Sequence, residues 1–335
     1  MKYPIGIQSF EKIRLGGYVY VDKTALIYQL ANTGSYYFLG RPRRFGKSLL
    51  ISTLEAYFSG QRELFEGLAI EKLEKDWTKY PILHLDLNTE KYNEPEILNA
   101  KLNDSLCKWE ERYGSFPSET SLSLRFAGII ERAAKVTGQR VVILVDEYDK
   151  PMLQVLGDEE LQDEYRNTLK AFYSVMKTQD KYIRFGLLTG VTKFGKVSVF
   201  SDLNNLKDIS MDDRFQTICG ITQEEIHANF ENPLQLLAAA NNTSYEDVCL
   251  RLKDSNFCLP DLTDEGVTAK TLTDVESFKD NPIAVIYQSG YLTIKGYEER
   301  FDTYQLGFPN KEVAEGFINY LVPYYTPVKD ALTGG

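Results

Sequence analysis

The fold is decided by the stretch Tyr36-Tyr37-Phe38-Leu39-Gly40-Arg41-Pro42-Arg43-Arg44-Phe45-Gly46-Lys47-Ser48. It starts as a short β-prone apolar run and becomes a loop that ends in Gly-Lys-Ser, and a helical pattern of apolar residues follows up to Phe58. A helix N-terminus carries unpaired backbone N–H groups and partial positive charge, and a polyphosphate satisfies both. Strand, loop and helix in this order are the context that a phosphate-binding loop requires.

The end of the loop has the residue types that phosphate binding needs. Gly46 lets the backbone approach phosphates closely, Lys47 is predicted to reach the β- and γ-phosphates, and Ser48 to hold Mg²⁺. The usual pattern has glycine five residues before Gly46, where this chain has Arg41. The predicted nucleotide-binding residues are Arg41, Pro42, Arg43, Arg44, Phe45, Gly46, Lys47, Ser48 and Leu49.

A second stretch, Val141-Val142-Ile143-Leu144-Val145-Asp146-Glu147, is an apolar run closed by two acids. A run that is apolar on both faces is typical of a central parallel strand, and open α/β sheets bind ligands at the carboxyl ends of such strands. We expect Asp146 to hold the Mg²⁺ shell together with Ser48, and Glu147 to act as general base on the attacking water. The alternative is a buried strand that enters an acidic turn. The upstream Gly-Lys-Ser favours the nucleotide site.

Residues 182–190 are predicted to form a further parallel strand that ends in a polar sensor. Thr189 or Thr192 would contact the γ-phosphate or its water, and we assign Thr189 a catalytic role; ordinary turn chemistry is the alternative. Nearby basic residues could act on a phosphate in cis or across an oligomer, although solvated surface charge is the favoured interpretation of each of them. These residues are Lys193, Lys196 and Arg214.

The remaining patterns alternate between helix and strand. A strand is predicted at 81–88, and helices at 25–32, 94–113, 118–135 and 159–178. Such alternation favours a parallel sheet flanked by helices. Asp22 or Thr24 is expected to cap the first of these helices. Residues 16–24 are interpreted as a structural collar, with the lining of a nucleotide base as the alternative.

The sequence pattern changes in the last third of the chain. Thr222-Gln223-Glu224-Glu225 matches a capping box, and short helical patterns follow it. Paired strands at 291–297 and 301–309 between helical patterns resemble a winged helix, for which protein packing is favoured over DNA contact. We therefore predict an α/β fold. It has a P-loop NTPase core with an additional strand and an N-terminal lead-in at 1–220, a helical lid at 221–256, and a connection with a winged-helix-like region at 257–335.

Composition excludes several classes of protein. The 335 residues contain no apolar stretch long enough for a membrane span and no signal-peptide core at the N-terminus, so a cytoplasmic location is expected. Four scattered cysteines indicate reduced thiols. With two histidines a His-rich metal site is excluded, and His84 is predicted to be a satisfied core residue. The net charge of −10 disfavours broad nucleic-acid binding.

Several motifs together resemble the bacterial AAA-ATPase-like family. They are Pro4-Ile5-Gly6-Ile7-Gln8-Ser9-Phe10, Tyr20-Val21-Asp22-Lys23-Thr24, Arg41-Pro42-Arg43-Arg44-Phe45-Gly46-Lys47-Ser48, Asp146-Glu147-Tyr148-Asp149-Lys150-Pro151, Thr189-Gly190-Val191-Thr192-Lys193-Phe194, Leu203-Asn204-Asn205-Leu206-Lys207-Asp208 and Tyr287-Gln288-Ser289-Gly290-Tyr291-Leu292. The resemblance implies a phosphate loop that bears arginines. Members usually carry a longer segment after the helix matched by 249–252, and many continue into a PD-(D/E)XK nuclease-like domain. This chain stops at Gly335, so no nuclease activity is assigned to it.

The sequence thus predicts a Mg²⁺-dependent ATP-binding protein, a slow ATPase that acts as a molecular switch. ATP is favoured over GTP because no Asn-Lys-x-Asp motif follows the core strands. One alternative binds ATP and barely turns it over. Another is a scaffold with a vestigial loop that binds protein or DNA. The expected partners are ATP and either a protein partner or further copies of the chain, with no membrane.

Overall fold

A computed structural model describes residues 2–4, 6–41, 45–155, 157–191, 205–222, 225, 228–229, 267–268, 287, 292–298, 300–301 and 303–308. The chain divides into two compact units, residues 1–256 and 257–335. The predicted division at 220 between a core and a helical lid stays a prediction, because most of residues 221–256 lie outside the described part.

The first unit is built on a five-stranded parallel sheet with the strand order β2-β3-β4-β1-β5. Its strands are β1 (Tyr36–Gly40), β2 (Ile82–Asp86), β3 (Val141–Asp146), β4 (Ile183–Gly190) and β5 (Lys207–Asp208). The strand that follows the acidic run, β4, therefore lies between β3 and β1. This order brings the carboxyl ends of β1, β3 and β4 to one edge of the sheet.

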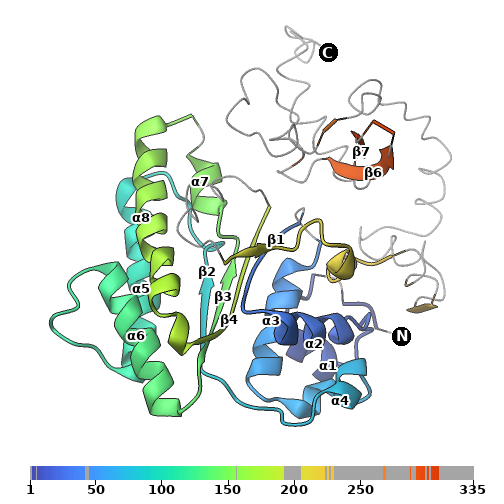
Figure 1. The fold of residues 1–335 in the computed structure, drawn as a ribbon, viewed down its shortest axis with the longest axis horizontal. Coiled ribbons are helices and arrows are strands. Elements are labelled where there is room, and N and C mark those ends of the chain that lie inside the picture. Colours follow the sequence, from blue (N-terminus) through green and yellow to red (C-terminus); the bar gives the residue numbers. More distant parts are fainter. Residues whose placement is uncertain are drawn as a thin grey trace, which may run out of the picture. The chain divides into compact units, whose positions relative to one another are not determined.

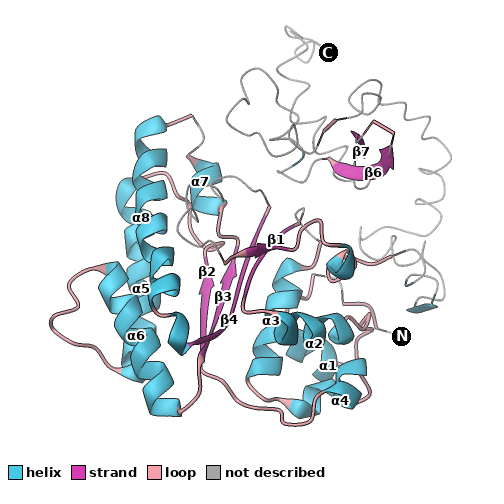
Figure 2. Ribbon diagram, in the orientation of Figure 1, coloured by secondary structure: helices cyan, strands magenta, loops and turns pink. Residues whose placement is uncertain are grey.

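Helices cover both faces of this sheet (Figure 1). One layer contains α1 (Phe10–Leu15), α2 (Thr24–Thr33), α3 (Lys47–Phe58) and α4 (Ala69–Leu73). The other contains α5 (Pro95–Tyr113), α6 (Leu122–Thr137) and α8 (Glu159–Thr178), and the short α7 (Lys150–Gln154) follows β3. The helix–sheet–helix layering is clear in Figure 2. It confirms the predicted α/β fold with a parallel sheet flanked by helices.

The position of β3 inside the sheet, between β2 and β4, explains why its first five residues are all apolar. All six residues of β3 are buried. Val141, Ile143 and Val145 pack in the core beneath α5, α6 and α8, whereas Val142 and Leu144 pack in the core on the α3 side. Successive side chains of a strand point to opposite faces, so a strand covered on both sides needs apolar residues at every position.

Two predicted helix starts differ from the structure. The helix expected from residue 118 begins at Leu122, because Ser121 is its N-cap and accepts a hydrogen bond from the N–H of Leu124 at 3.2 Å. The N-cap of α2 is Lys23, whose side chain makes no capping bond, although the predicted Asp22 does accept from the N–H of Thr24, the first residue of the helix, at 2.8 Å.

Asp22 and Thr24 also join the start of α2 to α4. The Asp22 carboxylate accepts from the N–H of Ala69 at 2.7 Å, and the Thr24 hydroxyl accepts from the N–H of Ile70 at 3.1 Å. These bonds satisfy two of the N–H groups that the first turn of α4 leaves without intrahelical acceptors. The N-terminal lead-in is thereby fixed to the helical layer beside α3.

The described part of the second unit is an antiparallel hairpin of β6 (Thr293–Glu298) and β7 (Thr303–Gly307), which confirms the predicted paired strands. Val267 forms an isolated bridge with Tyr304. The helices predicted around this hairpin lie almost wholly outside the described residues, so the winged helix stays a prediction. No helix in the described part of the chain has the length and apolar character needed to cross a membrane.

Candidate functional site

The phosphate-loop stretch joins β1 to α3 as its sequence predicts. Helix α3 begins at Lys47, and its N-cap Gly46 has a left-handed backbone with φ of 87°. Glycine adopts this conformation at little cost, so Gly46 allows the sharp entry into the helix. Pro42, Arg43 and Arg44 lie outside the described residues, and their contact with a nucleotide stays a prediction.

Lys47 connects the loop to the acidic end of β3. Its side chain is buried, and Nζ lies 3.2 Å from Oε1 of Glu147. The same ammonium donates a hydrogen bond to the carbonyl oxygen of Arg41 at 3.0 Å. A buried charge requires such partners. The two stretches that the sequence singled out, about a hundred residues apart, therefore meet in one ion pair.

Asp146 is the meeting point of three elements. Ser48 at the start of α3 donates its hydroxyl to one carboxylate oxygen at 2.6 Å. Thr189 at the end of β4 donates to the other carboxylate oxygen, also at 2.6 Å. Asp146 and Thr189 are both buried. The predicted metal ligands Ser48 and Asp146 and the predicted sensor Thr189 thus lie in direct contact.

Glu147 has both an unusual backbone and a perturbed carboxyl group. Its φ of 54° is left-handed, a conformation that non-glycine residues rarely adopt and that concentrates at functional sites. Burial raises the pKa of Glu147, Lys47 opposes this rise, and the carboxylates of Asp149 and Asp146 add to it, with a raised pKa as the result. A carboxyl group with a raised pKa is better suited to accept a proton near neutral pH.

The guanidinium of Arg41 binds the backbone of a later segment. It donates to the carbonyl oxygens of Ser210, Phe215 and Gln216, the last two at 3.3 Å. The backbone N–H of Arg41 also donates to the carbonyl oxygen of Gly190 at 3.1 Å. These described bonds hold the entrance of the loop, and a contact between Arg41 and nucleotide stays a prediction.

Two residues of this edge were not assigned a role from the sequence. Asp149 is fully buried, and its two carboxylate oxygens accept from the N–H of Val191 at 3.1 and 3.3 Å. Gly190 lies so close to Tyr148 that a Cβ would come within 2.6 Å of the ring. The acidic turn after β3 is therefore packed against the end of β4. The position of Asp149 just beyond an acidic strand end was the signal that could have found it.

The structure says little about the other residues that the sequence named as candidates for contact with a phosphate. Thr192, Lys193 and Lys196 lie outside the described residues. The exposed Arg214 forms an ion pair with Asp212 at 2.5 Å and lowers the pKa of that carboxyl. Their action on a phosphate stays a prediction.

His84 is not the satisfied core histidine that the sequence suggested. It is half-buried, and Nδ1 lies 3.4 Å from Oε2 of Glu55. Among the described residues Nε2 finds no hydrogen-bond partner. The strand pattern at 81–88 predicted burial, but β2 is the edge strand of the sheet and its side chains alternate between buried and half-buried.

Comparison with known proteins agrees with this arrangement. The family described as "Predicted AAA-ATPase" matches residues 4–200. The "Uncharacterized protein in vnfD 5'region" of Azotobacter chroococcum mcd 1 is 36% identical over 367 aligned positions, which cover 97% of this chain and 71% of the relative. This alignment is longer than the 335 residues of the chain, so the relative carries inserted segments. No solved structure matches significantly. The chain belongs to the predicted AAA-ATPase-like family.

Proposed function

We propose that the protein binds ATP with Mg²⁺ and hydrolyses it slowly, as a molecular switch. The observation that carries the proposal is the continuous set of contacts at the carboxyl edge of the sheet, in which Lys47 meets Glu147, and Ser48 and Thr189 both meet Asp146. Ammonium, hydroxyl and carboxylate groups at the start of a helix are the set that phosphoryl transfer requires. Membership of the predicted AAA-ATPase-like family supports the same activity.

The strand order supports a P-loop core with an additional strand. The phosphate-loop strand β1 and the acidic strand β3 are both bonded to β4, which brings Thr189 between them. A sensor on this strand would be adjacent both to the loop and to the acids. The position of Thr189 against Asp146 suits that role, because a change at the γ-phosphate could be transmitted through one hydrogen bond to β4.

The residues present fit Mg²⁺ that arrives with a nucleotide. Ser48 and Asp146 offer oxygen ligands, which Mg²⁺ prefers, and it commonly keeps several waters while one or two protein groups and substrate phosphates complete its shell. The described residues contain no cluster of three or more side chains that could form a metal cage of its own. Bound Mg²⁺ would neutralise charge on the phosphates. Ser48 and Asp146 would hold it in place.

The backbone and side chains of the site would each have a separate role in the reaction. The first N–H groups of α3 and the Lys47 ammonium would stabilise negative charge on the phosphates. Glu147 would orient the attacking water and take its proton, aided by its raised pKa. In the structure Lys47 is paired with Glu147. Entry of phosphates would therefore compete for the ammonium and free the carboxylate for its water.

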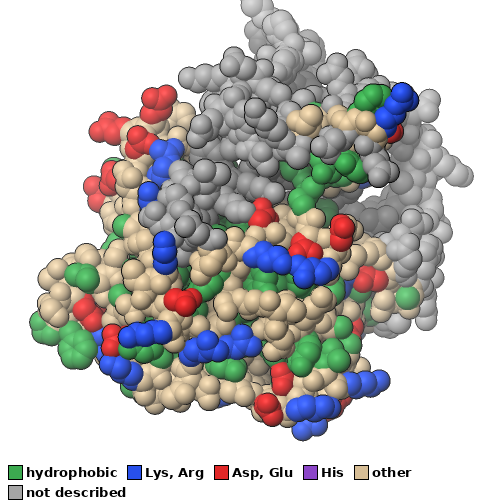
Figure 3. Space-filling model, in the orientation of Figure 1, with side chains coloured by type: hydrophobic (Ala, Val, Ile, Leu, Met, Phe, Trp, Pro, Cys, Tyr) green, Lys and Arg blue, Asp and Glu red, His purple; other side chains and the backbone are tan. Residues whose placement is uncertain are grey.

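A scaffold that binds DNA through its general surface is less well supported. The chain has a net charge of −10. On the face drawn in Figure 3, acidic and basic side chains of the described residues are interspersed instead of gathering into one basic patch. Non-specific DNA binding needs a positive surface that neutralises several phosphates. A nucleotide-binding switch with little turnover remains the closer alternative, since it uses the same residues.

Calorimetric titration with ATP, with and without Mg²⁺, tests the proposal. Lys47→Ala should weaken ATP binding at least tenfold, and Ser48→Ala should mainly abolish the gain that Mg²⁺ gives. Lys177→Ala, at an exposed position of α8, is the matched control and should bind like the wild type. Equal ATP affinity in wild type and Lys47→Ala would overturn the proposal.

Phosphate release measured for wild type and Glu147→Gln separates hydrolysis from binding. The variant should bind MgATP but lose at least 90% of the turnover, about tenfold or more, as expected when a general base is removed. If the wild type binds MgATP but turns over no faster than the variant, the switch without hydrolysis is the correct function.

A further inference from the structure

The turn that follows β3 contains a buried carboxylate to which the proposed reaction gives no role. This residue, Asp149, is fully buried. Burying a carboxylate is costly unless hydrogen bonds or an opposite charge compensate for the lost water. Asp149 is the N-cap of α7, yet its side chain makes no capping bond. The usual reason for aspartate at this position, acceptance of a hydrogen bond from the first turn of the helix, therefore does not apply.

The carboxylate of Asp149 reaches across to the end of β4 instead. Its two oxygens accept from the N–H of Val191 at 3.1 and 3.3 Å. Val191 stands two residues after Thr189, whose hydroxyl donates to Asp146. The N–H of Tyr148 donates to the carbonyl oxygen of Thr189 at 2.9 Å. Two consecutive residues of the turn are thus bonded to the chain on either side of Gly190.

Glu147 lies at the start of this turn and depends on its shape. Its backbone is left-handed, with φ of 54°, and its carbonyl oxygen accepts from the N–H of Lys150 at 3.1 Å. A left-handed conformation of a non-glycine residue costs on the order of 1–3 kcal/mol and persists only where the surroundings hold it. The Lys150 ammonium donates to the side-chain oxygen of Asn88, after β2, at 3.1 Å. The turn is therefore held from both neighbouring strands, and Asp149 acts on the β4 side.

We propose that Asp149 is a positioning residue that keeps the base Glu147 and the sensor Thr189 in a fixed relation to each other. The inference rests on the proposed function, because it concerns the reaction of that same site. Without the Asp149 carboxylate the turn would lose a bond to β4, and the backbone of Glu147 would relax. The Glu147 carboxylate would then leave the place from which it orients the water, and a displacement of about 1 Å can lower turnover about a hundredfold. The fit is close, since a Cβ on Gly190 would lie 2.7 Å from Oδ1 of Asp149.

Asp149→Asn tests this role, because asparagine keeps the size of the side chain and one acceptor oxygen but loses the charge. Phosphate release and calorimetric titration with MgATP should show kcat lowered roughly fivefold or more, with an affinity within about threefold of the wild type. Asp158→Asn is the matched control, since Asp158 is the N-cap of α8 and does accept from the N–H of Leu161, at 3.1 Å. It should leave kcat and affinity unchanged. An unchanged kcat in Asp149→Asn, or a kcat and an affinity that fall together, would overturn the proposal.

A double-mutant cycle with Glu147→Gln separates positioning from a general loss of structure. Asp149→Asn should change the residual turnover of Glu147→Gln little, because the base that it positions is already gone. Full multiplication of the two losses would overturn the proposal. Backbone hydrogen exchange at residues 189–191 should be faster in Asp149→Asn, and unchanged exchange would also overturn it. A wild type that turns over MgATP no faster than Glu147→Gln would reject the proposed hydrolysis and this role together.

Discussion

Replacing Glu147 with glutamine is expected to stabilise the protein without nucleotide while it removes the proposed hydrolysis. Glutamine keeps the length and hydrogen-bonding capacity of the side chain but removes a negative charge from a mostly buried position. The direction follows from the pKa of Glu147, which burial together with Asp149 and Asp146 raises by more than Lys47 lowers it. A raised carboxyl pKa means that the folded protein holds the charged form less well than the unfolded chain does.

The magnitude follows from two opposing terms. Two unit charges 3.2 Å apart, the separation of Lys47 Nζ and Glu147 Oε1, attract by about 5 kcal/mol at an effective dielectric constant near 20. Removing a carboxylate from water costs several kcal/mol, and Asp149 and Asp146 add repulsion. Each pKa unit of net rise corresponds to about 1.4 kcal/mol, and each kcal/mol to roughly 2–4 °C in Tm for a unit of this size. We expect Glu147→Gln to raise Tm by a few degrees at neutral pH.

The pH dependence provides an independent check. Below the unfolded pKa of about 4.3, Glu147 is protonated in both states and resembles glutamine. As the pH rises from there through the raised folded pKa, the unfolded chain gives up its proton first, and the wild type loses stability. The difference in Tm between variant and wild type should therefore be close to zero near pH 4 and reach its full value at neutral pH.

Differential scanning calorimetry of both proteins without nucleotide, from about pH 4 to about pH 8, makes this measurement. Glu164→Gln, an exposed position in the middle of α8, is the control and should leave Tm unchanged across the range. A lower Tm for Glu147→Gln at neutral pH would refute the reasoning, because it would mean that the pair with Lys47 outweighs the burial of the carboxylate.

Three further predictions concern the surroundings of the site. Gly190→Ala places a Cβ 2.6 Å from the buried Tyr148 ring, so thermal melting should show a loss of about 1–3 kcal/mol, and an unchanged Tm would contradict this packing. Arg41→Lys cannot reproduce the set of bonds to backbone carbonyls and should lower Tm by several degrees in the same assay, whereas a neutral result would mean that these bonds contribute nothing. Burial lowers the pKa of His84, but the Glu55 carboxylate outweighs it and the pKa is raised. His84→Gln should therefore cost a fraction of 1 kcal/mol below about pH 6.5 and nothing once the pH exceeds the raised pKa, and a loss that grows with pH would contradict the pair.

The residues that the sequence singled out and that the structure brings together belong to short contiguous patterns. The Gly-Lys-Ser triplet and the acids after the β3 run are patterns of adjacent residues, and topology rules place the carboxyl ends of parallel strands at one edge. The ion pair between Lys47 and Glu147 follows from these two patterns once both strands lie in one sheet. Thr189 was found in the same way, because it ends an apolar run.

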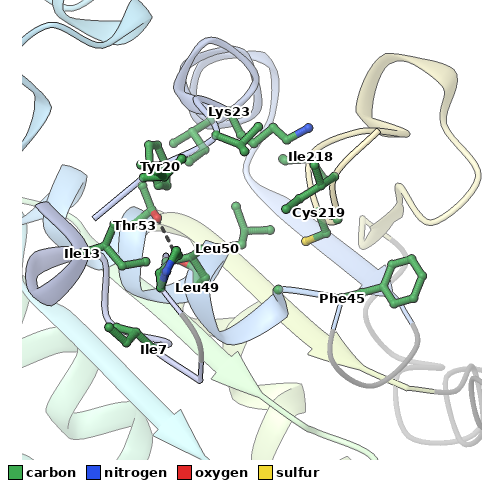
Figure 4. A pocket seen from close by; sticks show the side chains of 17 residues that line it. Ile7, Ile13, Tyr20, Lys23, Phe45, Leu49, Leu50, Thr53, Ile218 and Cys219 are labelled. Atoms are coloured by element: carbon green, nitrogen blue, oxygen red, sulfur yellow. Dashed lines mark hydrogen bonds between the residues drawn. The ribbon is translucent and has the colours of Figure 1, made fainter. Parts of the chain in front are cut away.

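The parts that the sequence could not predict depend on contacts between distant segments. The left-handed backbone of Glu147 arises where the acidic turn packs against β4, and no local pattern encodes it. A hollow beside the start of α3 is lined by both Tyr20 and Cys219 (Figure 4), residues that about two hundred positions separate. The contacts of Lys23 with Glu225 are of the same kind. Side-chain type predicts that such groups need partners, but only the fold decides which partners they find.

The departure of the loop from the usual glycine pattern has a structural explanation. Where other phosphate loops have glycine, Arg41 extends its guanidinium to the carbonyl oxygens of Ser210, Phe215 and Gln216. At the other end of the loop, the Phe45 carbonyl oxygen accepts from the N–H of Gly220 at 2.8 Å. The loop is thus held from outside by residues 210–220, which lie beyond the segment 4–200 that the family comparison matches. Both described ends of the loop are therefore bonded to one later piece of chain, which can replace the support that a glycine-rich loop draws from its own backbone.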